Sequence, residues 1–302
     1  MNYQILGRLL LSLTITVTAT RSFAQNVILG VLEESKGHYA GEPNYRDVRV
    51  IFQKTGDVWQ PFPSNCDNQA CLKSLTSTYP DETTWTIAFD GKNLGQVASH
   101  APSDFRWYSD IGQQAIISAN PVPTVGTRSA EFGGYTEASV YRPLVANSKP
   151  YFADPEQWKP FVPSSDITAL LQQAFRKKFP KLCRTSQNDQ SKLNEFSYRN
   201  EDIKVVKAYA SRPGSIVARL HLEAVDCQDT EAGFDIDDPW FFVDATKTVK
   251  YFDSGMWLVD AGDYDNDGRS ELIFSINRED EGGYEIWYEN FTKHATFKFI
   301  YH

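Results

Sequence analysis

The sequence DYDNDGRSEL, at residues 263–272, contains acidic residues whose spacing could bind a metal ion. With the first aspartate as position 1, carboxylates occupy positions 1, 3, 5 and 9, and glycine occupies position 6. These residues are Asp263, Asp265, Asp267, Glu271 and the glycine Gly268. Calcium takes about six to eight hard oxygen ligands in a flexible geometry. Alternate side chains of a tight loop can converge on one point, and glycine permits the sharp reversal that returns position 9 to the ion.

The backbone and the flanking residues define the kind of site. Position 7, Arg269, would offer its backbone carbonyl oxygen, with its side chain pointing away. An EF-hand loop has glutamate at position 12, whereas position 12 here is Phe274. The flanks MWLVDAG and ELIFSI are typical of strands. We therefore expect a calcium-binding turn between two strands.

The longer stretch LVDAGDYDNDGRSELIF resembles the FG-GAP (or VCBS) repeat of integrin-like β-propellers. Members of that family carry D-x-D-x-D-G-x-x-[DE]-hydrophobic between adjacent strands. The resemblance covers residues 250–300 at most, and the sequence contains no second copy of the motif. It implies the following Ca²⁺ ligands: Asp263, Asp265, Asp267, Glu271 and the carbonyl oxygen of Arg269.

The N-terminal residues predict a secretory signal peptide. Arg8 precedes the apolar run LLLSLTITVTAT, and the small residues Ser22 and Ala24 occupy positions −3 and −1 of a cleavage site after Ala24. A membrane anchor is the alternative, but the run is too short to span a bilayer comfortably. We expect residues 1–24 to be removed and the mature protein to be exported, to the periplasm or outside the cell, without a membrane span.

The charge of the chain limits its partners. The net charge of −9 becomes −11 once Arg8 and Arg21 leave with the signal peptide. An acidic chain repels nucleic acid and anionic lipid. The densest basic run, RKK at 176–178, lies on a predicted helix face and is interpreted as solvated. The expected partner is a protein or carbohydrate ligand, and no nucleic acid.

The cysteines predict disulfide bonds. An even number of cysteines in an exported chain indicates two disulfides. The economical pairing is Cys66–Cys71 and Cys183–Cys227. A zinc site is disfavoured, because the C-x4-C spacing has no second nearby pair and no suitably placed histidine.

Strands dominate the predicted secondary structure. Aromatic residues are plentiful and Gly/Pro turns recur, which favours strands. Alternating patterns predict strands or hairpins in these ranges: 48–62, 83–99, 204–210, 215–225, 238–252, 283–291 and 295–302.

Two helices are predicted. The segment SSDITALLQQAFRKKFP, at 164–180, places apolar residues on one helical face, and Ser165 or Asp166 could cap its start. A shorter helix is expected at about 68–77, begun by Asp67.

These elements predict a mainly β fold with a few short helices. The architecture expected from the resemblance is a partial or irregular β-propeller, and two β-rich domains are the alternative. The predicted regions are 25–162, N-terminal and β-rich, and 163–302, with one helix and the β-hairpins that carry the calcium loop.

The sequence shows no common catalytic motif. None of the five histidines has HExxH or other metal-ligand spacing, and there is no G-x-S-x-G elbow or phosphate-binding glycine loop. Paired carboxylates could support glycoside hydrolysis. The acidic residues that could serve in this way have no distinguishing pattern: Glu33–Glu34, Asp81–Glu82 and Glu131.

We therefore interpret the chain as an exported calcium-binding β module with a structural or ligand-binding role, rather than an enzyme. The alternative is a secreted hydrolase that acts on polysaccharide or peptide. A deep pocket with two convergent acids and aromatic walls would favour the enzyme.

Overall fold

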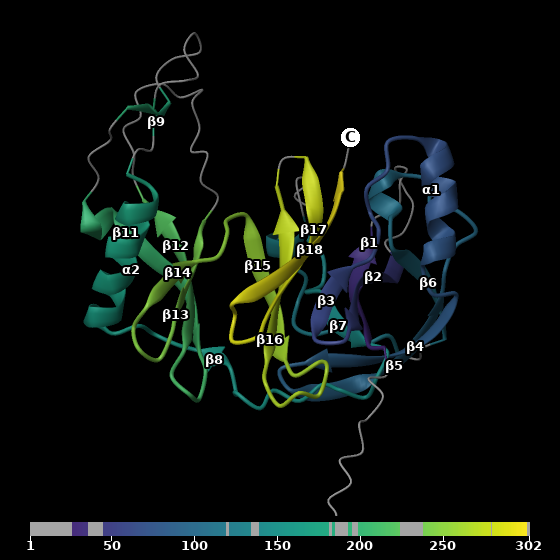
Figure 1. Ribbon diagram of the computed structural model, residues 1–302, viewed down its shortest axis with the longest axis horizontal. Coiled ribbons are helices and arrows are strands. Elements are labelled where there is room, and N and C mark those ends of the chain that lie inside the picture. The colour runs from purple at the N-terminus through teal and green to yellow at the C-terminus, as the bar shows by residue number, and fades with distance from the viewer. Residues whose placement is uncertain are drawn as a thin grey trace, which may run out of the picture.

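The computed structural model describes residues 26–35, 45–118, 121–133, 139–180, 183–184, 193–194, 199–223, 238–278 and 280–300. Within these residues the fold is mainly β, which confirms the predicted class. Three sheets stand side by side along the long axis, with a barrel at one end and a helix-covered sheet at the other (Figure 1).

The N-terminal sheet closes into a barrel. Its seven strands are antiparallel in the order β1-β7-β4-β5-β6-β2-β3, and pairing of β1 with β2 closes six of them. Closure removes the unpaired edges that an open sheet exposes. The strands are β1 (Ile28–Ser35), β2 (Tyr45–Thr55), β3 (Val58–Pro61), β4 (Glu82–Phe89), β5 (Lys92–His100), β6 (Gln113–Ser118) and β7 (Leu144–Asn147).

A five-stranded sheet, in the order β14-β13-β12-β11-β8, lies at the opposite end with helix α2 (Ser165–Lys178) (Figure 1). The helix buries Leu171 and Phe175 in the core of this sheet. Its cap is Ser164, which accepts from the Ile167 N–H, one residue before the cap expected from the sequence. The strands are β8 (Lys159–Pro160), β11 (Ile203–Ala210), β12 (Ile216–Leu222), β13 (Trp240–Val243) and β14 (Val249–Tyr251), and a separate short pair is β9 (Cys183–Arg184) and β10 (Leu193–Asn194).

The central sheet packs on both neighbours. Its four strands follow chain order: β15 (Met256–Gly262), β16 (Glu271–Asn277), β17 (Glu281–Tyr288) and β18 (Lys293–Ile300). Ile273 and Phe297 belong to the buried cluster of the barrel. Phe274 and Trp287 belong to a second cluster with residues of the five-stranded sheet. Burial on both faces explains the uninterrupted apolar run at the start of β16.

The predicted division at residues 162/163 stays a prediction. β8 pairs with β11 beyond that division, and one buried cluster joins barrel residues to the central sheet.

Cysteine pairing is confirmed for one of the two predicted disulfides. Cys66 and Cys71 are bonded, and the bond joins helix α1 (Gln69–Leu75) to the segment before it. The helix cap is Asn68 rather than Asp67, because the Asn68 side chain accepts from the Cys71 N–H. Cys227, and with it the second disulfide, lies outside the described residues, as does the predicted signal peptide.

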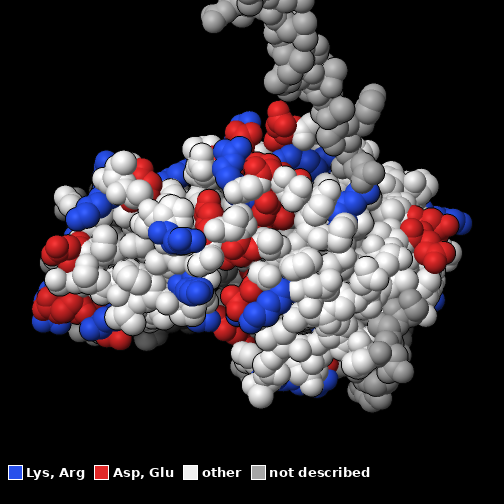
Figure 2. Space-filling view, turned by 90° about the horizontal axis from the view of Figure 1, so that it is seen from below, with Lys and Arg blue, Asp and Glu red and all other residues white. Residues whose placement is uncertain are grey.

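Acidic and basic side chains are interspersed on the surface. On the face in Figure 2, the described residues present no extended patch of one charge.

Candidate functional site

The acidic loop joins β15 to β16, so the predicted placement between two strands is confirmed. Asp263, Asp265 and Asp267 each bring a carboxylate oxygen to within 4.8 Å of the others. Two residues turn the loop sharply: Asn266 and Gly268 have φ values of 63° and 89°. Glycine adopts this left-handed backbone without steric cost. Three carboxylates of the predicted Ca²⁺ ligands therefore converge in the loop.

Backbone amides hold the first carboxylate in place. Asp263 Oδ1 accepts from the Asp267 N–H and Oδ2 from the Gly268 N–H, both at 2.9 Å. Burial raises the pKa of Asp263. The Arg269 side chain was expected to point away from the loop. Instead, its guanidinium group lies 3.2 Å from Asp267 Oδ2.

Glu271 stands beside the three aspartates rather than among them. It is buried at the start of β16, and its Oε2 accepts from the Tyr264 N–H at 2.8 Å. Burial raises its pKa well above the ordinary value, and repulsion by Asp265 raises it further. A cation in the loop would stabilise the charged form of this carboxyl group.

A lysine of the barrel contacts the loop. Lys54, at the end of β2, forms an ion pair with Asp265. The two side chains are only 13% and 4% exposed, respectively. The rings of Trp59 and Tyr288 lie 5.2 Å and 5.6 Å from the ammonium group and add cation–π attraction. A cation is therefore already built into the neighbourhood of the loop.

The segment that follows the barrel also holds the loop. Ser270 Oγ donates to Asp154 Oδ1 at 2.6 Å, and the Asp263 N–H donates to the Ala153 carbonyl oxygen at 2.7 Å. Neither Lys54 nor Asp154 is identifiable from the sequence as a neighbour of the loop. A lysine in a hairpin and an aspartate in a proline-rich stretch are too common to signal this contact.

A cavity of about 240 Å³ lies next to the loop, where the three sheets meet. Its walls include Phe89, Trp158 and Tyr209. Asp260 lines it and accepts from the Asp90 N–H and the Tyr264 hydroxyl, both at 3.0 Å. Burial raises the pKa of Asp260 to about 6, although the two hydrogen bonds oppose the shift.

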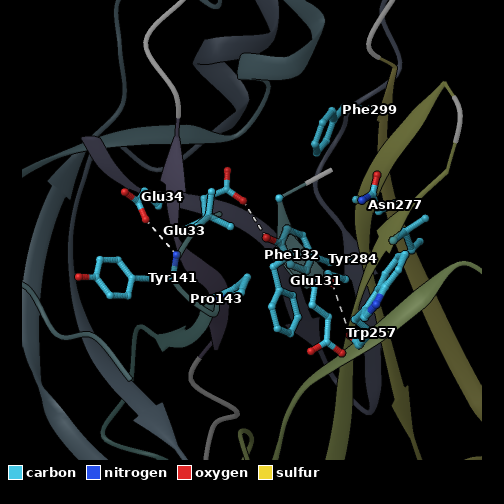
Figure 3. Close-up of a pocket in the computed structure, with 15 residues that line it drawn as sticks. Glu33, Glu34, Glu131, Phe132, Tyr141, Pro143, Trp257, Asn277, Tyr284 and Phe299 are labelled. Atoms are coloured by element: carbon cyan, nitrogen blue, oxygen red, sulfur yellow. Dashed lines mark hydrogen bonds between the residues drawn. The ribbon is translucent and has the colours of Figure 1, made fainter. Parts of the chain in front are cut away.

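A second cavity, the interface cleft, separates the barrel from the central sheet (Figure 3). It measures about 120 Å³. Three of the acids named from the sequence line it together: Glu33 and Glu34 from β1, and Glu131 from the 3₁₀ turn η3 (Ala130–Phe132). Asp81 and Glu82 do not line it and are exposed. Aromatic side chains form much of the remaining wall: Phe132, Tyr141, Trp257, Tyr284 and Phe299.

Each glutamate of the interface cleft has a cationic partner. Glu33 pairs with Arg49 at 2.6 Å, and the Tyr284 hydroxyl donates to its other oxygen at 2.7 Å. Glu34 pairs with Arg128, and Glu131 pairs with Lys207. The cleft is therefore polar but close to electrically neutral.

Comparison with known proteins assigns no family. No family model matches the chain, and neither a curated protein nor a solved structure matches it. Among the described helices, none combines the length and apolar character that crossing a membrane requires. A functional proposal consequently depends on the loop and the two cavities themselves.

Proposed function

We propose that the protein is an exported calcium-binding β module, in which the ion stabilises the junction of its sheets. The proposed ligands are Asp263, Asp265, Asp267, Glu271 and the carbonyl oxygen of Arg269. The convergence of three aspartates within 4.8 Å carries the proposal. Carboxylates at this separation repel one another, and a divalent cation with oxygen ligands offsets that repulsion. The loop contacts the barrel through Lys54 and the segment that follows the barrel through Asp154. An ion that orders the loop would therefore also stabilise its contacts with the barrel and with that segment.

The resemblance to the FG-GAP repeat is supported by the central sheet. A propeller blade is a four-stranded antiparallel sheet, and β15–β18 have that number and a simple up-and-down order. The acidic loop joins the first two strands of this sheet. We therefore extend the proposal to one blade-like unit beside a barrel, in place of a partial or irregular propeller over the whole chain.

Export is supported by the Cys66–Cys71 disulfide, since disulfides persist mainly in oxidising compartments. Calcium is abundant outside cells, and sites in extracellular modules often bind with Kd of about 10⁻⁴–10⁻³ M. The proposed partner is a protein or carbohydrate ligand.

Calorimetric titration with calcium chloride tests the site. The mature protein is expected to bind one Ca²⁺, and Asp265→Ala should abolish binding because it removes a ligand. Arg269→Ala is the matched control: the backbone carbonyl remains, so binding should persist. Magnesium should bind more weakly, because it demands a smaller and stricter octahedron. Absence of binding at millimolar calcium would show that the loop is only an acidic turn.

The second candidate is a secreted hydrolase acting on polysaccharide or peptide. One observation favours it: Glu33, Glu34 and Glu131 meet in an aromatic-walled cleft. The ion pairs of all three weaken the case, because each carboxylate is already engaged by a basic side chain of the protein. Screening with chromogenic glycosides and peptides is expected to show no turnover. Turnover that disappears in Glu131→Gln would establish the hydrolase instead.

A further inference from the structure

The wall of the interface cleft on the central sheet is a row of large, small and large residues. Trp257, Ser275 and Tyr284 are cross-strand neighbours on β15, β16 and β17. Cross-strand neighbours of an antiparallel sheet place their side chains on the same face. The small serine therefore leaves a notch between two aromatic side chains. Trp257 is half-buried on the edge strand, so part of its ring remains available.

The next row widens this notch. Asn277 follows Ser275 on the same face of β16, and its cross-strand neighbour is Gly282, which has no side chain. The Oδ1 atom of Asn277 is buried and accepts no hydrogen bond from the described residues. Buried polar atoms of this kind usually have a partner in protein, water or ligand. Asn277 also lines the interface cleft (Figure 3).

The opposite wall supplies further acceptors without net charge. Glu131 and Phe132 face the central sheet across the cleft (Figure 3). Lys207 pairs with Glu131, and Arg219 lies 3.7 Å from the same oxygen. A carboxylate held by cations still accepts hydrogen bonds from hydroxyl groups. Neither a cationic nor an anionic ligand would gain much net attraction here.

We propose that the interface cleft binds one ring of a neutral saccharide. The cleft fits a sugar because it combines an aromatic wall, hydrogen-bond acceptors and a balanced charge. The C–H face of the sugar packs on Trp257, and its hydroxyl groups donate hydrogen bonds to Asn277 and Glu131. The cavity is several times larger than the space for one water molecule, yet too small to enclose an oligosaccharide. Neighbouring sugar units therefore remain in solvent.

Titration calorimetry with cellotetraose, xylotetraose, chitotetraose and maltotetraose tests this proposal. At least one of these probes is expected to bind. Trp257→Ala should weaken that binding about tenfold, as expected for a tryptophan at the centre of a contact. Trp257→Phe should retain most of it, and Asn277→Ala should weaken it about fivefold. Tetragalacturonic acid should bind more weakly than its neutral counterparts, because the described lining of the cleft includes no lysine or arginine.

Trp107→Ala is the matched control. Trp107 is a tryptophan 51% exposed on the barrel side and does not line the cleft. Binding that is lost in Trp107→Ala and retained in Trp257→Ala would overturn the proposal, as would failure of all four neutral probes to bind. The inference depends on the ligand-binding part of the proposed function and not on the calcium site. A parallel titration with calcium chloride tests the calcium site separately, and saccharide titrations repeated with a chelator test the cleft without calcium. The two results show whether the calcium site or the saccharide site has failed.

Discussion

Lys54→Met is expected to lower the free energy of unfolding of the calcium-free protein by about 3 kcal/mol. The variant removes the cation that pairs with Asp265, whose side chain is almost fully buried. Breaking one partner of a buried ion pair leaves an uncompensated charge, and that charge has little access to water. The methionine keeps an apolar stem against Trp59 and Tyr288, so lost packing contributes little.

Calcium is expected to reverse this loss, because Ca²⁺ would replace the ammonium group as the counter-ion of Asp265. A ligand that binds only the folded state stabilises it by RT ln(1 + [L]/Kd), or about 2.7 kcal/mol at 100 Kd. In Lys54→Met this gain should exceed the wild-type gain by about 3 kcal/mol, since the competing cation is absent. Urea unfolding with chelator and with excess calcium measures both gains.

Lys92→Met is the control for this experiment. Lys92 also pairs with an aspartate, Asp90, but at 3.6 Å and with both side chains mostly exposed. Exposed pairs contribute about 0–1 kcal/mol, so stability should hardly change with or without calcium. If Lys54→Met and the wild type gain equally from calcium, Lys54 does not compete with the ion.

Asp260→Asn is expected to stabilise the protein at neutral pH by up to about 3 kcal/mol. Burial raises the pKa of Asp260 to about 6, whereas aspartate in an unfolded chain titrates near 3.9. Between these two values the folded protein binds more protons than the unfolded chain does. The free energy of unfolding therefore falls as pH rises from about 4 to about 6, and levels off above that range.

The asparagine removes this dependence. Its carbonyl oxygen can still accept from the Asp90 N–H, and its amide group can donate to the Tyr264 hydroxyl oxygen. Variant and wild type should be similar near pH 4, diverge as pH rises from about 4 to about 6, and differ by a constant amount above that range. Thermal unfolding in chelator across this range measures the difference. Burial also raises the pKa values of Asp263 and Glu271. Both residues are present in variant and wild type, so the difference between the two proteins reports the titration of Asp260 alone. Parallel curves for the two proteins would contradict the prediction.

The local structures could be predicted from the amino-acid sequence. Alternation and turn residues predicted both hairpins of the barrel region, β2–β3 and β4–β5, and both described α-helices, because these features involve residues close in the chain. The same holds for the acidic loop. Its aspartates are two residues apart and Gly268 supplies the reversal, so residues close in the chain bring the three carboxylates together. Helix starts were misplaced by one residue, because neighbouring polar residues compete for the cap.

The surroundings of that loop depend on contacts between segments that are distant in the chain. Lys54 and Asp265 are 211 residues apart in the chain, and Tyr284 lies 251 residues from Glu33. Pairings at such separations depend on how β1 and β2 close the barrel and on which face of the central sheet packs against it. Hydrophobic alternation reports that a strand has a buried face, but it does not identify the strand or sheet that covers it. The barrel, the competing lysine and the interface cleft therefore follow from packing.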